Sequence, residues 1–300
     1  MQHDSIHDRD EAFAAFQVEA NKIFSTHKSF DPDTKLCLFG VPADNHLRFG
    51  QRVPLEQIPR SVAGFGFYMS DQNLDLVRAL VRTKIPQQLK TLLVGGTTFG
   101  YSLDLSAYQT ESTGEYRNLI RELSQVEYPQ LESLGLGVYE LYCNDGTIFY
   151  PIGDVTRILQ NVPVVQELWL CGHFELTQRC VFPELTEINV EMEDDWSPEV
   201  PPLSQASLDN LLHSEFPKLD ELYIDLASAA LSPTYEIPSE FLSGTDVPTL
   251  RKLEMVGCFS PDTAKEFSES PLANRCNSTA RLTRLDPTGE EIEKIFVDSC

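Results

Sequence analysis

One spaced phrase occurs five times between residues 128 and 255 and constrains the fold more than any other feature. It consists of an apolar residue, Pro, any residue and an apolar anchor, followed by two further apolar positions with one residue between them. The copies are Tyr128–Leu136, Val162–Leu170, Phe182–Val190, Phe216–Ile224 and Val247–Met255. Chance rarely produces five copies, so we expect a repeat architecture in which each unit buries its apolar face against its neighbours.

Each copy predicts one short strand. The last two apolar positions alternate with their neighbours, as a half-buried strand requires. The Pro falls just before the strand, where it ends the preceding element and removes no ladder hydrogen bond. We therefore expect ten residues to be buried in successive parallel strands: Leu134, Leu136, Leu168, Leu170, Ile188, Val190, Leu222, Ile224, Leu253 and Met255.

Apolar residues at helical spacing fill most of the gaps between these strands. The segments that carry them are Leu74–Val81, Tyr116–Leu123, Val155–Leu159, Leu208–Leu212 and Ile292–Phe296. Alternation of strands and helices predicts a parallel sheet with helices packed on one side. Only 20 residues separate the anchors Val165 and Leu185, so we expect a short loop or a single turn there.

Weaker copies extend the repeat in both directions. Ile58–Val62 and Ile85–Leu89 align with the phrase, and Leu282 is a further candidate anchor. Ahead of them, residues 10–28 have the spacing of an amphipathic helix, and residues 36–39 are a strand candidate. Because the end of a repeat array must be covered, we expect residues 1–57 to form a capping segment and residues 58–300 to form the repeats.

The spaced phrase resembles the strand segment of leucine-rich-repeat proteins, over roughly residues 58–298. The resemblance implies an α/β solenoid with a parallel concave β-sheet and convex helices. The family places Asn or Cys three residues after the last strand Leu, and only Cys258 conforms here, which predicts nonstandard turns. The resemblance also implies recognition of another molecule rather than catalysis.

The overall charge and the cysteines limit the partners and the compartment. A formal net charge of −23 disfavours nucleic acid and anionic membranes, which are both polyanions. No segment has the length of a membrane span, and the N-terminus has no signal-peptide pattern. Seven scattered cysteines without CxxC pairs indicate a reducing compartment, so we expect a cytoplasmic protein.

Negative charge is concentrated in one part of the repeats. Residues 163–246 hold seventeen Asp or Glu and only two basic residues, Arg179 and Lys218. Side chains alternate across a strand, so the residues between the buried positions are expected to share one face. The candidate partner-binding residues on this face and in the following acidic loop are Glu167, Trp169, Glu187, Glu191, Asp194, Asp195, Trp196, Glu221, Tyr223, Asp225 and Glu254.

Aromatic residues ringed by charge have the composition of interface hot spots. The sequence therefore predicts a non-enzymatic module that binds a basic protein, with inhibition of a basic toxin or nuclease as the sharpest version. No G-x-S-x-G, phosphate loop or H-E-x-x-H motif is present, and we assign no catalytic, cofactor or metal residue. Two alternatives stay open: a metal-dependent enzyme or cation-binding protein using the loop Glu191–Asp195, or a structural scaffold whose acidic residues only solvate the sheet.

Overall fold

The computed structural model describes residues 64–67, 71–94, 117–137, 152–192, 203–226, 234–285 and 291–298. The expected helix over residues 10–28, the strand over 36–39, the repeat copy Ile58–Val62 and the boundary after residue 57 lie outside these ranges. Within them the chain is a mixed α/β structure built on a mainly parallel sheet.

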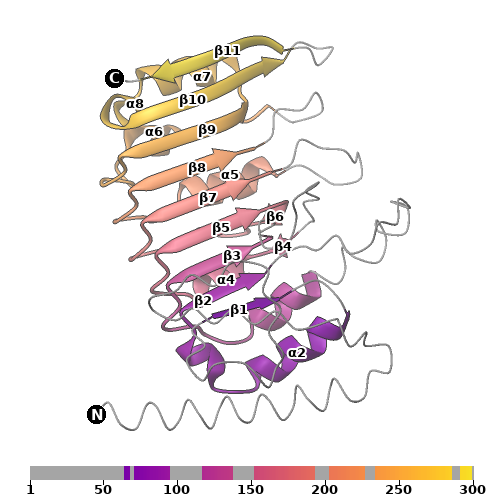
Figure 1. The fold of residues 1–300 in the computed structure, drawn as a ribbon. Helices are drawn as coiled ribbons and strands as arrows, with labels where there is room; N and C mark the ends of the chain where they lie inside the picture. Colours follow the sequence, from indigo (N-terminus) through magenta and orange to yellow (C-terminus); the bar gives the residue numbers. More distant parts are fainter. Residues whose placement is uncertain are drawn as a thin grey trace, which may run out of the picture.

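Nine strands form this sheet among the described residues, and they follow one another in chain order (Figure 1). Every neighbouring pair is parallel except the last, β10 and β11, which is antiparallel. The strands are β1 Gly64–Phe67, β2 Thr91–Val94, β3 Ser133–Leu136, β5 Glu167–Cys171, β7 Glu187–Glu191, β8 Glu221–Asp225, β9 Lys252–Cys258, β10 Asn277–Leu285 and β11 Glu291–Asp298.

Helices occupy most of the connections between these strands. They are α2 Asp71–Val81, the 3-10 turn η2 Ile85–Gln88, a helix over 117–123, α4 Thr156–Gln160, α5 Gln205–Leu212, α6 Ser239–Ser243, α7 Pro261–Glu269 and α8 Pro271–Arg275. Three of them begin at a serine, Ser204, Ser260 or Ser270, whose hydroxyl accepts a backbone N–H three residues on. Such a cap satisfies one of the free donors at a helix start.

The ten residues expected in parallel strands are all buried, none more than 3% exposed. The register aligns them across the sheet, so that Leu134 pairs with Leu168, Leu168 with Ile188, and Ile188 with Leu222. The repeated phrase therefore predicted both the strands and their register correctly.

The prolines of the phrase lie in β-turns. Pro129, Pro163, Pro217 and Pro248 are exposed, and in each case the N–H of the anchor two residues later donates to the carbonyl of the residue before the Pro, at 3.2–3.3 Å. Proline suits the second position of such a turn because its φ is already fixed near the required value. The residues before the Pro are buried, and the rings of Phe182 and Phe216 stack at 5.4 Å.

A second backbone pattern joins each repeat to the next. The residue just before each strand offers one carbonyl oxygen, and two consecutive N–H groups of the following repeat donate to it at 2.7–3.1 Å. Thus Gln166 accepts from Thr186 and Glu187, and Thr186 accepts from Asp220 and Glu221. The shared carbonyls are those of Lys90, Glu132, Gln166, Thr186 and Asp220.

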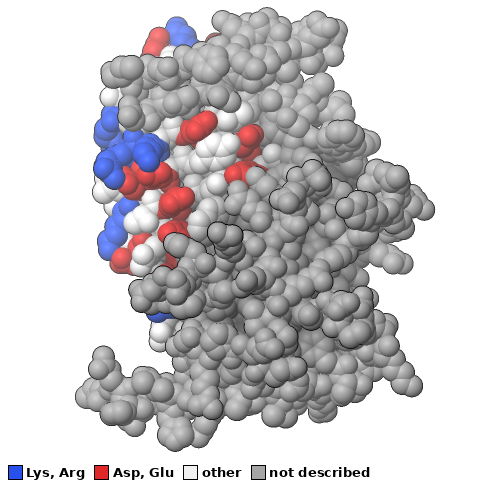
Figure 2. Space-filling model, viewed as in Figure 1, with Lys and Arg blue, Asp and Glu red and all other residues white. Residues whose placement is uncertain are grey.

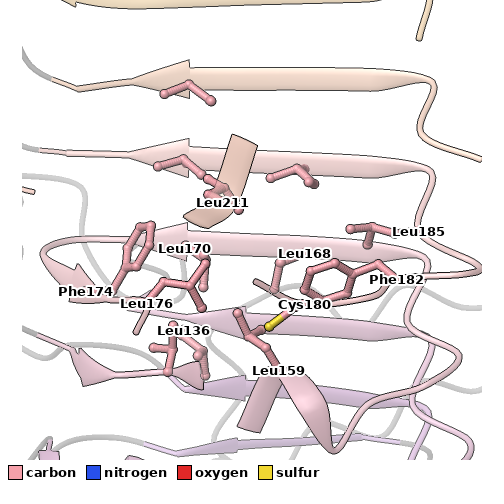
Figure 3. Packing of buried hydrophobic residues seen from close by; sticks show 14 of the residues in the cluster. Leu136, Leu159, Leu168, Leu170, Phe174, Leu176, Cys180, Phe182, Leu185 and Leu211 are labelled. Atoms are coloured by element: carbon pink, nitrogen blue, oxygen red, sulfur yellow. The ribbon is translucent and has the colours of Figure 1, made fainter. Parts of the chain in front are cut away.

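The core lies between the sheet and the helices that cover one of its faces (Figures 1 and 3). In Figure 3 Leu168 and Leu170 of β5 lie together with Leu159 of α4 and Leu211 of α5, all at most 2% exposed. Residues 172–186 contain no helix. They form turns, an isolated bridge between Val181 and Glu215, and the two-residue strand β6 Phe174–Glu175, which pairs with β4 Gly153–Asp154. The short connection after Val165 was expected, whereas the small second sheet was not.

The prediction for the C-terminal segment is wrong in two respects. Ile292–Phe296 was expected to be helical, but it lies in β11, which pairs antiparallel with β10. Leu282 is not a repeat anchor, because β10 already starts at Asn277, which is paired with Lys252 of β9. A short apolar run fits either period, and here the β-branched and aromatic residues, which favour strands, decide the outcome.

Replacement of Leu222 by Ala tests the stacked core. Leu222 is 3% exposed and lies between Ile188 and Leu253 in the register, so we expect the free energy of unfolding to fall by about 2–5 kcal/mol. Urea unfolding followed by circular dichroism measures it. Val181→Ala is the control, since Val181 is 60% exposed and should change stability by less than about 0.5 kcal/mol. Equal effects of the two substitutions would contradict the stacked core.

The cysteines give a second prediction. Cys171, Cys180, Cys258 and Cys276 are buried thiols, and burial, with a smaller contribution from the Asp154 carboxylate, raises the pKa of the Cys180 thiol to about 11. Because the thiolate is the reactive form, we expect these four to react with Ellman's reagent only after unfolding. All seven cysteines should then titrate as thiols under denaturing, non-reducing conditions, and the loss of four or more to disulfides would contradict the expected reducing compartment.

Candidate functional site

Three neighbouring strands, β5, β7 and β8, bring together nine residues from three repeats on the sheet face opposite the buried leucines. Their register forms three rows of three, one residue from each strand in every row. The first row is Glu167, Glu187 and Glu221; the second is Trp169, Asn189 and Tyr223; the third is Cys171, Glu191 and Asp225.

We call the partly exposed members of these rows, together with Glu254 of β9, the acidic face. Glu254 extends the middle row, because it pairs with Tyr223. Equivalent residues on adjacent strands lie about 4.8 Å apart, so one ligand can contact several repeats at once. Cys171 is the exception in the three rows, being only 3% exposed.

The first row places three carboxylates side by side. Glu187 lies in the middle, and partial burial followed by the charges of Glu167 and Glu221 raises the pKa of its carboxyl. The two ends of the row are occupied by polar or basic groups. Ser133 of β3 donates a hydrogen bond to Glu167 at 2.7 Å, and the Lys252 ammonium pairs with Glu221. Both neighbours therefore repel the Glu187 carboxylate, and the Lys252 ammonium offsets this effect only in part.

The middle row carries the aromatic rings. The Tyr223 hydroxyl donates to Asp225 at 3.4 Å. Burial and then the carboxylates of Asp225, Glu191 and Glu254 raise the pKa of the phenol. Tyr223 is therefore neutral at physiological pH and is surrounded by carboxylates from three strands.

Asn189 lies at the centre of the nine residues. Its amide nitrogen donates to Glu191 at 3.1 Å, which fixes the orientation of the amide. Its oxygen Oδ1 is buried and accepts no hydrogen bond from any described residue. A buried acceptor without a donor costs about 1–3 kcal/mol, so this is an unfavourable arrangement in the free protein.

Basic residues lie along the side of the sheet at which the strands begin. Four ion pairs join consecutive repeats there: Lys90 with Glu132, Lys218 with Glu184, Arg251 with Asp220, and Lys252 with Glu221. Figure 2 shows the blue groups along this left edge, with the red carboxylates extending further across the strands. On the acidic face, Glu167, Glu187, Glu191 and Glu254 form no ion pair with a described basic residue.

Eight of the eleven candidate residues are placed by the structure, and all eight share the acidic face. Asp194, Asp195 and Trp196 lie outside the described residues. Sequence reasoning missed the importance of Asn189, although its position between Trp169 and Tyr223 followed from the repeat spacing. It also missed that Lys252 neutralises the last carboxylate of the first row. The sequence indicated this, because Lys252 occupies the position that Glu holds in three other copies of the phrase.

Metal binding has no support from the described part of the chain. Among those residues no group of three or more His, Cys, Asp or Glu is arranged to hold a metal ion. Of the acidic residues in the loop Glu191–Asp195, Glu191 alone is among the described residues, and it accepts a hydrogen bond from Asn189.

Replacement of Glu187 by Gln tests the cost of ionising this carboxyl, which is partly buried and lies between two other carboxylates. The native pKa of Glu187 lies above its ordinary value of 4.5, so ionisation destabilises the fold at neutral pH. That cost disappears as the pH falls through the raised native pKa towards the unfolded value. We expect Glu187→Gln to raise the free energy of unfolding at pH 7 by a few tenths of a kcal/mol, roughly the scale of exposed charge pairs.

Urea unfolding at pH 7 and near pH 4 measures this difference, and the advantage of the variant should shrink at the lower pH. Glu175→Gln is the matched control, because Glu175 is exposed on β6 outside the row. A pH-independent gain at Glu187, or an equal gain at Glu175, would contradict the repulsion.

Two further findings do not concern the acidic face. No helix among the described residues is long and apolar enough to cross a membrane. No protein-family model, curated protein or solved structure matches this chain.

Proposed function

We propose that this protein is a non-enzymatic binding module that engages a basic protein through the acidic face. The observation that carries the proposal is the register of β5, β7 and β8, which aligns Glu167, Glu187 and Glu221 beside the aromatic row. Repulsion among aligned carboxylates is unfavourable in the free protein, and a cationic partner relieves it. The aromatic residues add contact area of the kind found at interface hot spots.

We propose further that the described strands belong to a leucine-rich-repeat solenoid, with the acidic face on the concave side of the sheet. Support comes from the one-strand-per-copy order, the repeated Pro turns and the shared carbonyl hydrogen bonds. A solenoid presents equivalent positions of successive repeats to one ligand. The protein then acts in the cytoplasm, and its sharpest role is inhibition of a basic toxin or nuclease, with carboxylates at the positions where phosphates would lie.

Charge reversal tests the proposed face. The probes are two basic proteins, pancreatic ribonuclease and egg-white lysozyme, with binding followed by surface plasmon resonance. Replacing Glu187, Glu191 and Asp225 together by Lys should slow association about tenfold or more and weaken its salt dependence. Trp169→Ala or Tyr223→Ala should mainly speed dissociation and cost about 2 kcal/mol or more of binding free energy if the ring is a hot spot.

The control has the same change in net charge. Glu175, Glu236 and Glu266 are exposed and lie outside the acidic face, so their joint replacement by Lys separates a local effect from the overall charge. Equal slowing by both triple variants would contradict the proposed face. The proposed face would also be contradicted if the Lys triple variant and the Trp169 and Tyr223 variants bound normally while Arg121→Glu, on the helix over 117–123, lost binding. A parallel assay of ribonuclease activity shows whether binding also inhibits the enzyme.

A further inference from the structure

The middle row of the acidic face has the arrangement of a receptor for one planar cation. Trp169 and Tyr223 lie on the strands that flank Asn189, so their backbones are about 10 Å apart, twice the spacing of adjacent strands. Along its own strand, Asn189 has Glu187 two residues before it and Glu191 two residues after it. The central amide is thus bordered by aromatic rings in one direction and by carboxylates in the other.

The buried oxygen of Asn189 is independent of this charge pattern and requires a hydrogen-bond donor. The amide nitrogen is already used by Glu191, so the amide cannot be reversed without loss of that bond. The oxygen has no donor among the described residues. Because this oxygen is buried, an arriving donor reaches it only after a change of side-chain rotamer, which is common on binding.

An arginine side chain satisfies all of these groups together. The guanidinium is planar, stacks on aromatic rings, carries five N–H donors and is more weakly hydrated than an ammonium. One N–H can donate to Asn189 while others donate to carboxylates in charge-assisted hydrogen bonds. A lysine ammonium supplies the charge but neither the planar stacking nor the fork of donors.

We infer that the acidic face recognises an arginine of its basic partner, received over Asn189 between Trp169 and Tyr223, with Glu187 and Glu191 on either side. This inference rests on the proposed function and specifies the partner's side chain. Asn189 is then the residue that positions the guanidinium between the rings, because its oxygen is the acceptor of the middle row that lies between Trp169 and Tyr223. Without that acceptor the guanidinium loses the stacked geometry that distinguishes it from an ammonium.

Short peptides test the inference directly. Labelled hexa-arginine and hexa-lysine carry the same charge, and their affinities for the intact protein can be compared by fluorescence anisotropy at about 150 mM salt, where nonspecific attraction is screened. We expect hexa-arginine to bind about fivefold or more tightly than hexa-lysine, which is the upper end of the range for a cation–π contact at an exposed ring. Hexa-citrulline, which keeps the shape without the charge, should not bind measurably.

Substitution of Asn189 by Leu separates a binding role from a structural one. We expect the preference for hexa-arginine to disappear, while the resistance of the free protein to urea is unchanged or increased, because the unpartnered buried oxygen has been removed. The matched control is Gln125→Leu. Gln125 also donates its side-chain amide to a carboxylate, that of Glu122, but it lies outside the acidic face, so the preference should persist.

Equal affinity of the wild-type protein for the two peptides would overturn the inference, as would an unchanged preference in Asn189→Leu. Asn189→Ala serves as the second variant if the Asn189→Leu protein does not fold. If the arginine preference fails while the Lys triple variant still slows association with the basic proteins, only this inference falls. If the triple variant has no effect on those proteins, the proposed function itself falls.

Discussion

The carbonyl oxygen shared between consecutive repeats fixes the rest of the structure. It accepts from the last N–H before a strand and from the first N–H within it, so it sets where each strand begins relative to its neighbour. A slip of one residue would transfer every leucine from the core to the opposite face. Burial of Leu168, Ile188 and Leu222 and exposure of Glu167, Glu187 and Glu221 are therefore two consequences of one register.

The repeated phrase contained most of this information because each part of it has a local physical role. Proline occupies the turn position that its fixed φ favours, and the anchor closes that turn. The two apolar positions then alternate onto the core side. Glu187 and Tyr223 could be assigned to one face from spacing alone, because the period of a strand is two and the repeats are in register.

The parts that could not be predicted depend on contacts that a local pattern does not contain. Ile292–Phe296 has the spacing of a helix and the composition of a strand, and only its pairing with β10 decides between them. Gly137 is a similar case. Its φ of 75° is left-handed, and a Cβ there would lie 1.7 Å from the carbonyl oxygen of Cys171 in the next repeat, a contact between segments that are distant in sequence.

The distribution of charge argues for recognition over solubility alone. Solubility requires only that carboxylates be exposed, and turns and helix surfaces provide such places without crowding. At the strand-start edge the chain neutralises its carboxylates with Lys218, Arg251 and Lys252 of neighbouring repeats. In the first row it nevertheless aligns Glu167, Glu187 and Glu221, of which only Glu221 has an ion pair with a described residue, and it buries an amide oxygen that has no donor among the described residues. These two unfavourable features coincide at Asn189 and its neighbours, and a cationic donor from a partner would relieve both at once.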